Sequence, residues 1–180
     1  MTGASSQLAL RVAELRAAFD RAFAAPVRTD AAVRHDLLAI RVDAEPCAIR
    51  LSEVGGLFAD RRVTPIPASD AALIGIAGFR GAIVPVYGLR AVLGQAPHQE
   101  VPRWLVTAVT APVALAFDLF EGHLRVPADA ILPQQSPERL RGYAPEFVRS
   151  ADAVRPVLHL PSIIAALENA RTVFSMRSEP

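Results

Sequence analysis

Few residues in this chain have the type and spacing that chemistry requires. Asp118 and Glu121 are close together at the end of an apolar segment, so they could act as a general acid and base. A strand-end turn with both charges in solvent is the commoner setting for such a pair. The four histidines, at positions 35, 98, 123 and 159, lie far apart without metal-ligand spacing. We therefore expect no enzyme activity, no metal and no cofactor.

A second candidate motif is a run of glycines. Gly75, Gly78 and Gly81 recur at three-residue spacing, but the Gly-x-Gly start and the long helix of a dinucleotide site are missing. A phosphate-binding loop with lysine is excluded, since all 19 basic residues are arginine. Turn and packing requirements explain these glycines better than a ligand does.

The composition predicts a globular protein and excludes several classes. Hydrophobic residues make up 52% of the 180 residues, enough for a sizeable core. With 19 basic and 18 acidic residues and 6% aromatic residues, the chain lacks the field and the stacking surfaces of a nucleic-acid binder. The single cysteine, Cys47, excludes an intrachain disulfide and is expected to be a buried core residue.

No targeting segment or membrane span is apparent in the sequence. Charged residues interrupt the N-terminal apolar pattern, and the most apolar internal run, residues 104–117, is shorter than the roughly 20 residues that a spanning helix needs. We expect a soluble, cytoplasmic protein.

The element that the rest of the chain must position is a β-hairpin. Residues 74–79 are apolar and favour a strand, Arg80 and Gly81 form the turn, and residues 82–87 return. Gly81 suits a positive φ angle. Because proline donates no hydrogen bond, Pro85 predicts an edge or a bulge at that point. A short helix over residues 89–93 follows.

Around this hairpin the pattern is that of many short strands. Proline and glycine punctuate them, which favours one or two small barrels over a doubly wound fold. Ile83 and Leu115 are candidate core positions. Strands are predicted over 35–43, 47–54, 63–66, 74–79, 82–87, 103–109, 113–117, 119–126, 147–150 and 154–160, with a break at 55–56 and a turn at 121–122.

Two helices flank the predicted strands. Residues 5–25 form an amphipathic helix, whose apolar stripe packs on its own domain or serves a partner or self-association. Residues 162–171 form the last helix, after Pro161 in its first turn.

The hairpin resembles the conserved pattern of CheW-like domains, the coupling proteins of bacterial chemotaxis. The order and spacing of the remaining segments follow the same family from about residue 37 to residue 167. The residues that fill the hairpin pattern are Gly75, Phe79, Arg80, Gly81, Pro85, Val86 and Leu89.

The resemblance implies a mainly β fold of two small five-stranded SH3-like barrels that share a hydrophobic core. Residues 1–34 would be the N-terminal helix and linker, residues 35–170 the CheW-like domain, and residues 171–180 a C-terminal tail. It further implies a non-enzymatic chemotaxis adaptor. Such adaptors couple chemoreceptors (methyl-accepting chemotaxis proteins) to the regulatory domain of the histidine kinase CheA, in the cytoplasm at membrane-associated receptor arrays.

The same resemblance implies a receptor-binding groove between the barrels. A helical receptor tip would lie in it, and Arg80 would donate a charge-assisted hydrogen bond. The residues that would face the receptor are Val54, Gly75, Ile76, Arg80 and Gly81.

Two groove positions depart from the family pattern. Gly56 stands where an acidic residue is usual, and Gly78 stands where asparagine is usual. These departures favour an alternative, a diverged scaffold in a related signalling array with a different helical partner. A third hypothesis, an enzyme or small-ligand sensor, predicts a deep pocket between the barrels.

Overall fold

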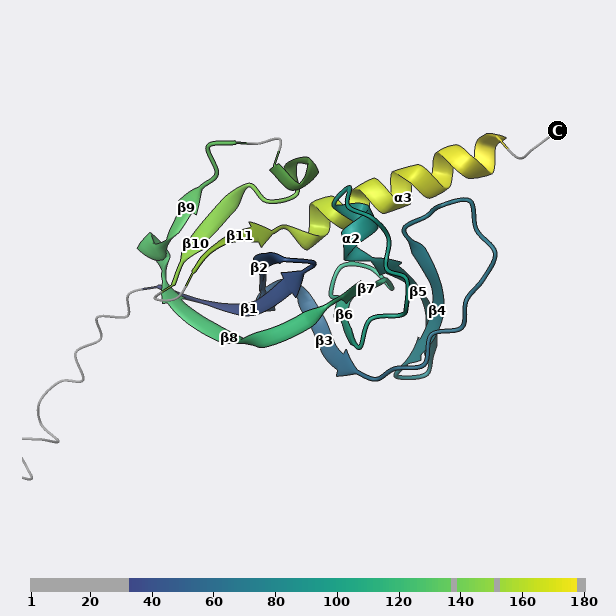
Figure 1. The fold of residues 1–180 in the computed structure, drawn as a ribbon, viewed down its shortest axis with the longest axis horizontal. Coiled ribbons are helices and arrows are strands. Elements are labelled where there is room, and N and C mark those ends of the chain that lie inside the picture. The colour runs from purple at the N-terminus through teal and green to yellow at the C-terminus, as the bar shows by residue number, and fades with distance from the viewer. Residues whose placement is uncertain (1–32, 137–138, 151–152, 178–180) are drawn as a thin grey trace, which may run out of the picture. The chain divides into compact units, whose positions relative to one another are not determined.

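A computed structural model describes residues 33–136, 139–150 and 153–177 of the chain (Figure 1). The fold is mainly β, as predicted, and its strands form two mixed sheets. The predicted N-terminal helix over residues 5–25 lies outside the described residues.

The first sheet has six strands, one more than predicted. Only the contact between β2 and β11 is parallel, and the other contacts are antiparallel. The strands lie in the order β8 (Leu119–Pro127), β1 (Arg34–Val42), β2 (Glu45–Arg50), β11 (Val154–Leu158), β10 (Glu146–Arg149) and β9 (Ile131–Pro133).

The second sheet has the predicted five strands. The β5–β7 contact is parallel and the other three contacts are antiparallel. The strands lie in the order β3 (Val54–Ala59), β6 (Trp104–Ala108), β7 (Ala114–Phe117), β5 (Ala82–Gly88) and β4 (Leu73–Phe79).

The chain passes between the sheets at two places. A 3₁₀ turn, Leu51–Glu53, joins β2 to β3, and Asp118 alone separates β7 from β8. The second sheet is therefore an insertion between strands of the first, so neither sheet is formed by one continuous stretch of chain.

The second sheet curls until its two edge strands meet. The rings of Phe58 on β3 and Phe79 on β4 have centroids 4.7 Å apart. Between these strands Thr64 forms an isolated bridge with Ile76, with N–H···O distances of 2.8 and 2.9 Å. The strand predicted over residues 63–66 is reduced to this bridge, because neither proline beside it, Pro65 or Pro67, can donate to a ladder.

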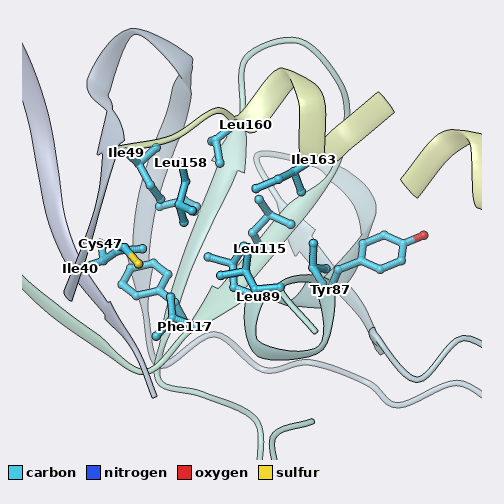
Figure 2. Close-up of a cluster of buried hydrophobic side chains, with 14 of the residues drawn as sticks. Ile40, Cys47, Ile49, Tyr87, Leu89, Leu115, Phe117, Leu158, Leu160 and Ile163 are labelled. Carbon is cyan, nitrogen blue, oxygen red and sulfur yellow. The ribbon is translucent and has the colours of Figure 1, made fainter. Parts of the chain in front are cut away.

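Three apolar clusters fill the fold. Small clusters lie against each sheet, and a larger one lies between the sheets and confirms the predicted shared core (Figure 2). Cys47 is fully buried in it, as expected. Side chains of the shared core include Ile40, Cys47 and Ile49 of the first sheet, Tyr87, Leu115 and Phe117 of the second, and Leu89, Leu158, Leu160 and Ile163.

Two helices complete the described part of the chain. The short α2 (Leu89–Val92) follows β5, as predicted. The last helix, α3 (Leu160–Arg177), begins with a hydrogen bond from the Leu160 N–H to the Glu53 carboxylate, 2.8 Å, and a carboxylate there favours a helix start. The helix passes residue 171, where the sequence predicted a C-terminal tail.

The strand break predicted at residues 55–56 and the turn predicted at residues 121–122 are both wrong, and for the same physical reason. Gly55 and Gly56 lie inside β3, and Glu121 and Gly122 lie inside β8. At each place the register with the paired strand shifts, so the extra residue is absorbed in a β-bulge and the strand continues.

Pro85 lies in β5, an internal strand of the second sheet, but only one neighbouring strand pairs with it at this position. It pairs with Ile76 of β4, and the pairing of β5 with β7 begins at the next residue, Val86. Proline is tolerated here because no residue of β7 pairs with it, so the N–H that proline lacks is not needed for a second ladder.

Candidate partner-binding surface

The β4–β5 hairpin presents Arg80 at a tight two-residue turn. Arg80 has φ 48° and Gly81 has φ 86°, so both central residues are left-handed, as in the turns that match strand twist. Positive φ at Gly81 was predicted; positive φ at Arg80 was not. Asparagine or glycine would adopt this conformation more readily, so the arginine is conformationally costly.

The outer side of the hairpin forms a continuous surface, here called the hairpin face. Ala77 and Phe79 point inward and are buried, so the alternate residues of β4 point outward. Ile83 lies opposite Gly78 and is 75% exposed, so its assignment to the core is wrong. The hairpin face comprises Ile76, Gly78, Arg80, Ile83 and Pro85.

Gly75, expected at the receptor groove, is buried in β4. A Cβ atom here would lie 2.2 Å from the Thr64 carbonyl oxygen, and the φ angle is +158°. The close approach of Thr64 therefore explains why this residue is glycine, whatever surface lies beside it.

Val54 lies far from the hairpin turn. It begins β3 beside the shared core, is half-buried, and pairs with Ala108. The other end of β3 approaches the hairpin, because Phe58 contacts Phe79. A strand rises about 3.3 Å per residue, so the two ends of β3 are roughly 17 Å apart. The fold thus places Ile76, Arg80 and Gly81 on one hairpin but separates Val54 from the turn.

The two altered glycines have different surroundings. At Gly56 a Cβ atom would lie 2.8 Å from the ring of Phe58, whereas at Gly78 no atom lies within 4 Å. An added side chain would therefore displace an aromatic ring at Gly56 but would project into open space at Gly78.

Asp118 and Glu121, the candidate acid–base pair, bind different partners. The Asp118 carboxylate accepts hydrogen bonds from Arg90, 2.6 and 3.0 Å, and from the backbone N–H of Asp43, 2.7 Å. His98 lies 3.5 Å from it. We call Asp43, Arg90, His98 and Asp118 the seam cluster, because it joins the β1–β2 turn to α2 where the chain changes sheets.

Electrostatic interactions within the seam cluster favour the ionised form of the Asp118 carboxylate. Burial by itself would raise the pKa of Asp118, but the hydrogen bonds from Arg90 and Asp43, together with the nearby positive charge, outweigh it and hold the pKa below its ordinary value. Burial lowers the pKa of His98 and outweighs the attraction of Asp118, which favours the neutral imidazole. The cluster therefore fits a structural contact better than a proton-transfer site.

Glu121 belongs to a separate network at the bulge of β8. Arg41 and the buried Arg155 both bind its carboxylate. Burial would raise the pKa of Glu121, but the hydrogen bonds from Arg41 and Arg155 lower it overall. The sequence favoured a turn in which both charges face solvent. That prediction is wrong, because arginine side chains bind the carboxylates of both Asp118 and Glu121.

Hollows occur away from the hairpin face. The hollow beside the seam cluster has a volume of about 470 Å³ and is lined by the loop over residues 96–102 together with Arg90 and Asp118. Within the residues that the structure describes, no cluster of metal-ligand side chains is present. None of the described helices is long and apolar enough to cross a membrane.

Comparisons with known proteins define the class of this two-sheet fold. The family model of the CheW-like domain matches residues 36–168, so the chain belongs to the CheW-like domain family. This confirms the resemblance carried by the hairpin.

A solved structure has the same fold. The scaffolding protein TtCheW from Thermoanaerobacter tengcongensis matches with a TM-score of 0.61 and 15% sequence identity, over 69% of this chain and 88% of that one. A comparison with curated proteins finds no match.

The sequence reasoning missed an arginine that contacts the ring of Phe79, the residue before Arg80. Arg61 lies over the rings of Phe58 and Phe79, with its Cζ 5.3 and 5.8 Å from their centroids. Arg62 follows it. The adjacent pair of arginines was a signal in the sequence, but nothing local linked it to a hairpin about twenty residues later.

Proposed function

We propose that this protein is a non-enzymatic adaptor that couples chemoreceptors (methyl-accepting chemotaxis proteins) to the histidine kinase CheA. The observation that carries the proposal is the match to the CheW-like domain over residues 36–168. The fold shared with a scaffolding protein and the involvement of Asp118 and Glu121 in ion pairs support it. Its place would be the cytoplasm, at membrane-associated receptor arrays.

The hairpin face is the proposed receptor-binding surface. Arg80 is exposed on a tight turn and occupies a conformation that favours other residue types, which suggests that its charge is needed there. Ile76 is half-buried further along β4 on the hairpin face and would supply apolar contact to a receptor helix. Gly75 and Gly81 would shape the backbone, and Val54 would contact the far end of a long helical tip.

A diverged scaffold with a different helical partner is the second candidate. Gly78 favours it, because the open space at this position leaves the middle of the hairpin face without a polar side chain. Gly56, under the ring of Phe58, likewise offers no carboxylate. This candidate predicts weak binding to a standard receptor tip.

Calorimetric titration of the full chain tests the proposal. A CheA regulatory domain and a receptor tip fragment, both from the same organism, would each be titrated separately. Micromolar binding of both supports the adaptor, and binding of neither at tens of micromolar contradicts it. Binding of the kinase domain alone favours the diverged scaffold.

A further inference from the structure

Four arginines gather at one end of the second sheet. Arg61 lies over the rings of Phe58, the last residue but one of β3, and Phe79, the last residue of β4. Arg80 follows Phe79 directly. We call this group the arginine end; it lies where β3 finishes and the β4–β5 hairpin turns (Figure 1). Its members are Arg61, Arg62, Arg80 and Arg103.

Backbone contacts fix these arginines relative to one another. The Asp60 N–H donates to the Arg103 carbonyl, 2.9 Å, so the start of β6 lies against the end of β3. The bridge between Thr64 and Ile76 then holds the segment after β3 against β4. Arg62 lies in that segment, two residues before Thr64.

Most of the positive charge at the arginine end is unneutralised. Asp60 pairs with Arg103, at 3.1 Å. Arg61, Arg62 and Arg80 are exposed and have no acidic partner within ion-pair distance among the residues that the structure describes. The whole chain has a net charge of only +1, so this concentration is local.

The residue types at this surface point to carboxylates. A guanidinium presents paired donors that match a carboxylate, and its stacking on an aromatic ring leaves those donors free at its edge. The Cζ of Arg61 lies within cation–π distance of the rings of Phe58 and Phe79, and the side chain stays exposed.

An apolar side chain lies next to the charge. Ile83, on the same hairpin as Arg80, is 75% exposed, and Gly78 opposite it contributes no side chain. A surface that combines an exposed isoleucine with three unpaired arginines fits a protein segment that carries both apolar and acidic residues. A nucleic acid or an anionic membrane usually calls for a larger basic patch than these three unpaired arginines provide.

We infer that the arginine end, together with Ile83, docks an acidic, amphipathic segment of a protein partner. This inference rests on the proposed adaptor function only in taking the partner to be a protein. It adds Arg61, Arg62 and Arg103 to the surface and specifies the chemistry of the segment that binds.

The test uses a model peptide and the full chain. The probe is a helical peptide of about 20 residues built from glutamate, alanine and leucine, and its matched control replaces each glutamate by glutamine. We expect the protein to bind the glutamate peptide in preference, with an affinity that falls as salt rises. The double variant Arg61→Gln/Arg62→Gln should lose about tenfold in affinity or more.

A matched variant controls for lost charge and lost ring contact. Arg149 is an exposed arginine of the first sheet whose Cζ lies 5.7 Å from the Phe147 ring centroid. Arg149→Gln should leave the affinity for the glutamate peptide unchanged, and the thermal midpoints of all variants should match.

Several outcomes overturn the inference. These are equal affinity for the glutamine peptide, an equal loss in Arg149→Gln, or no binding of the glutamate peptide at about 1 mM. Binding of anionic phosphatidylglycerol vesicles that depends on Arg61 and Arg62, without peptide binding, would assign the surface to a membrane instead.

The same variants separate this inference from the adaptor proposal. If the receptor tip and the kinase domain bind the wild type but the glutamate peptide does not, the adaptor stands and the docking inference fails. If neither binds but the glutamate peptide binds through Arg61 and Arg62, the adaptor fails and the docking inference stands.

Discussion

The seam cluster and the arginine end hold their charges in opposite ways. At the seam, Arg90 is satisfied by Asp118 and Asp43, partly out of solvent, where the chain passes between sheets. At the arginine end, Arg61 and Arg62 extend into solvent, and the local acidic residue, Asp60, serves another arginine. Paired charges thus join the sheets, and unpaired charges remain available to a partner.

This difference gives the sequence's nearly equal numbers of acidic and basic residues, 18 and 19, a structural meaning. Several carboxylates, including Asp118, Glu121 and Glu146, are engaged by arginines within the fold. The net charge of +1 therefore does not describe the surface, because its distribution leaves one region strongly basic.

The largest difference in stability should lie between alanine variants of Leu115 and Ile83. Leu115 is fully buried in the shared core, so Leu115→Ala should lower the free energy of unfolding by about 2–5 kcal/mol. Ile83→Ala removes an exposed side chain and should change it by less than about 0.5 kcal/mol. Chemical denaturation measures both, and a large loss in Ile83→Ala would contradict the exposed hairpin face.

A second contrast compares two glycines of β4. In Gly75→Ala the new Cβ would overlap the Thr64 carbonyl oxygen, so a loss of about 1–3 kcal/mol or more is expected. Gly78→Ala adds a methyl group in open space and should be neutral or slightly stabilising. Denaturant midpoints of the two variants give the answer, and equal effects would mean that the Thr64 bridge does not form.

A third contrast compares two aspartates. Asp118→Asn should lower the free energy of unfolding by about 1–3 kcal/mol at neutral pH, because charged hydrogen bonds from Arg90 and Asp43 weaken. Asp60→Asn weakens an exposed pair with Arg103 and should matter by about 0.5 kcal/mol or less.

The pH dependence sharpens the Asp118 prediction. The folded-state pKa of Asp118 lies below its ordinary value of 3.8, so its contribution is present above that value and is lost as pH falls through the folded pKa. Unfolding of the wild type and of Asp118→Asn should therefore converge in acid. A constant gap from neutral pH into acid would exclude the carboxylate charge as its cause.

Substitutions of Arg80 should affect partner binding more than stability. Arg80→Asn suits the left-handed turn and should raise the free energy of unfolding by up to about 1 kcal/mol. Arg80→Ala should leave the melting temperature nearly unchanged. Calorimetry should show that both variants weaken receptor binding, by about 1–3 kcal/mol. Unfolding of Arg80→Ala would instead make Arg80 structural.

Much of the fold could be predicted where the signal was local. The hairpin, its turn at Arg80 and Gly81, and the short helix after it follow from apolar alternation and turn chemistry. The errors fell where a strand absorbs an extra residue, at Gly55–Gly56 and Glu121–Gly122, because a bulge and a turn share the same residue types.

The sequence by itself determined the family, the mainly β class, the burial of Cys47 and the hairpin that presents Arg80. Only the tertiary structure decided that Ile83 faces solvent and that Arg61 contacts Phe79, the residue before Arg80. The reason is physical. Alternation along a strand separates its two faces, but which face meets a core, and which distant segments meet, depend on how each sheet curls and pairs.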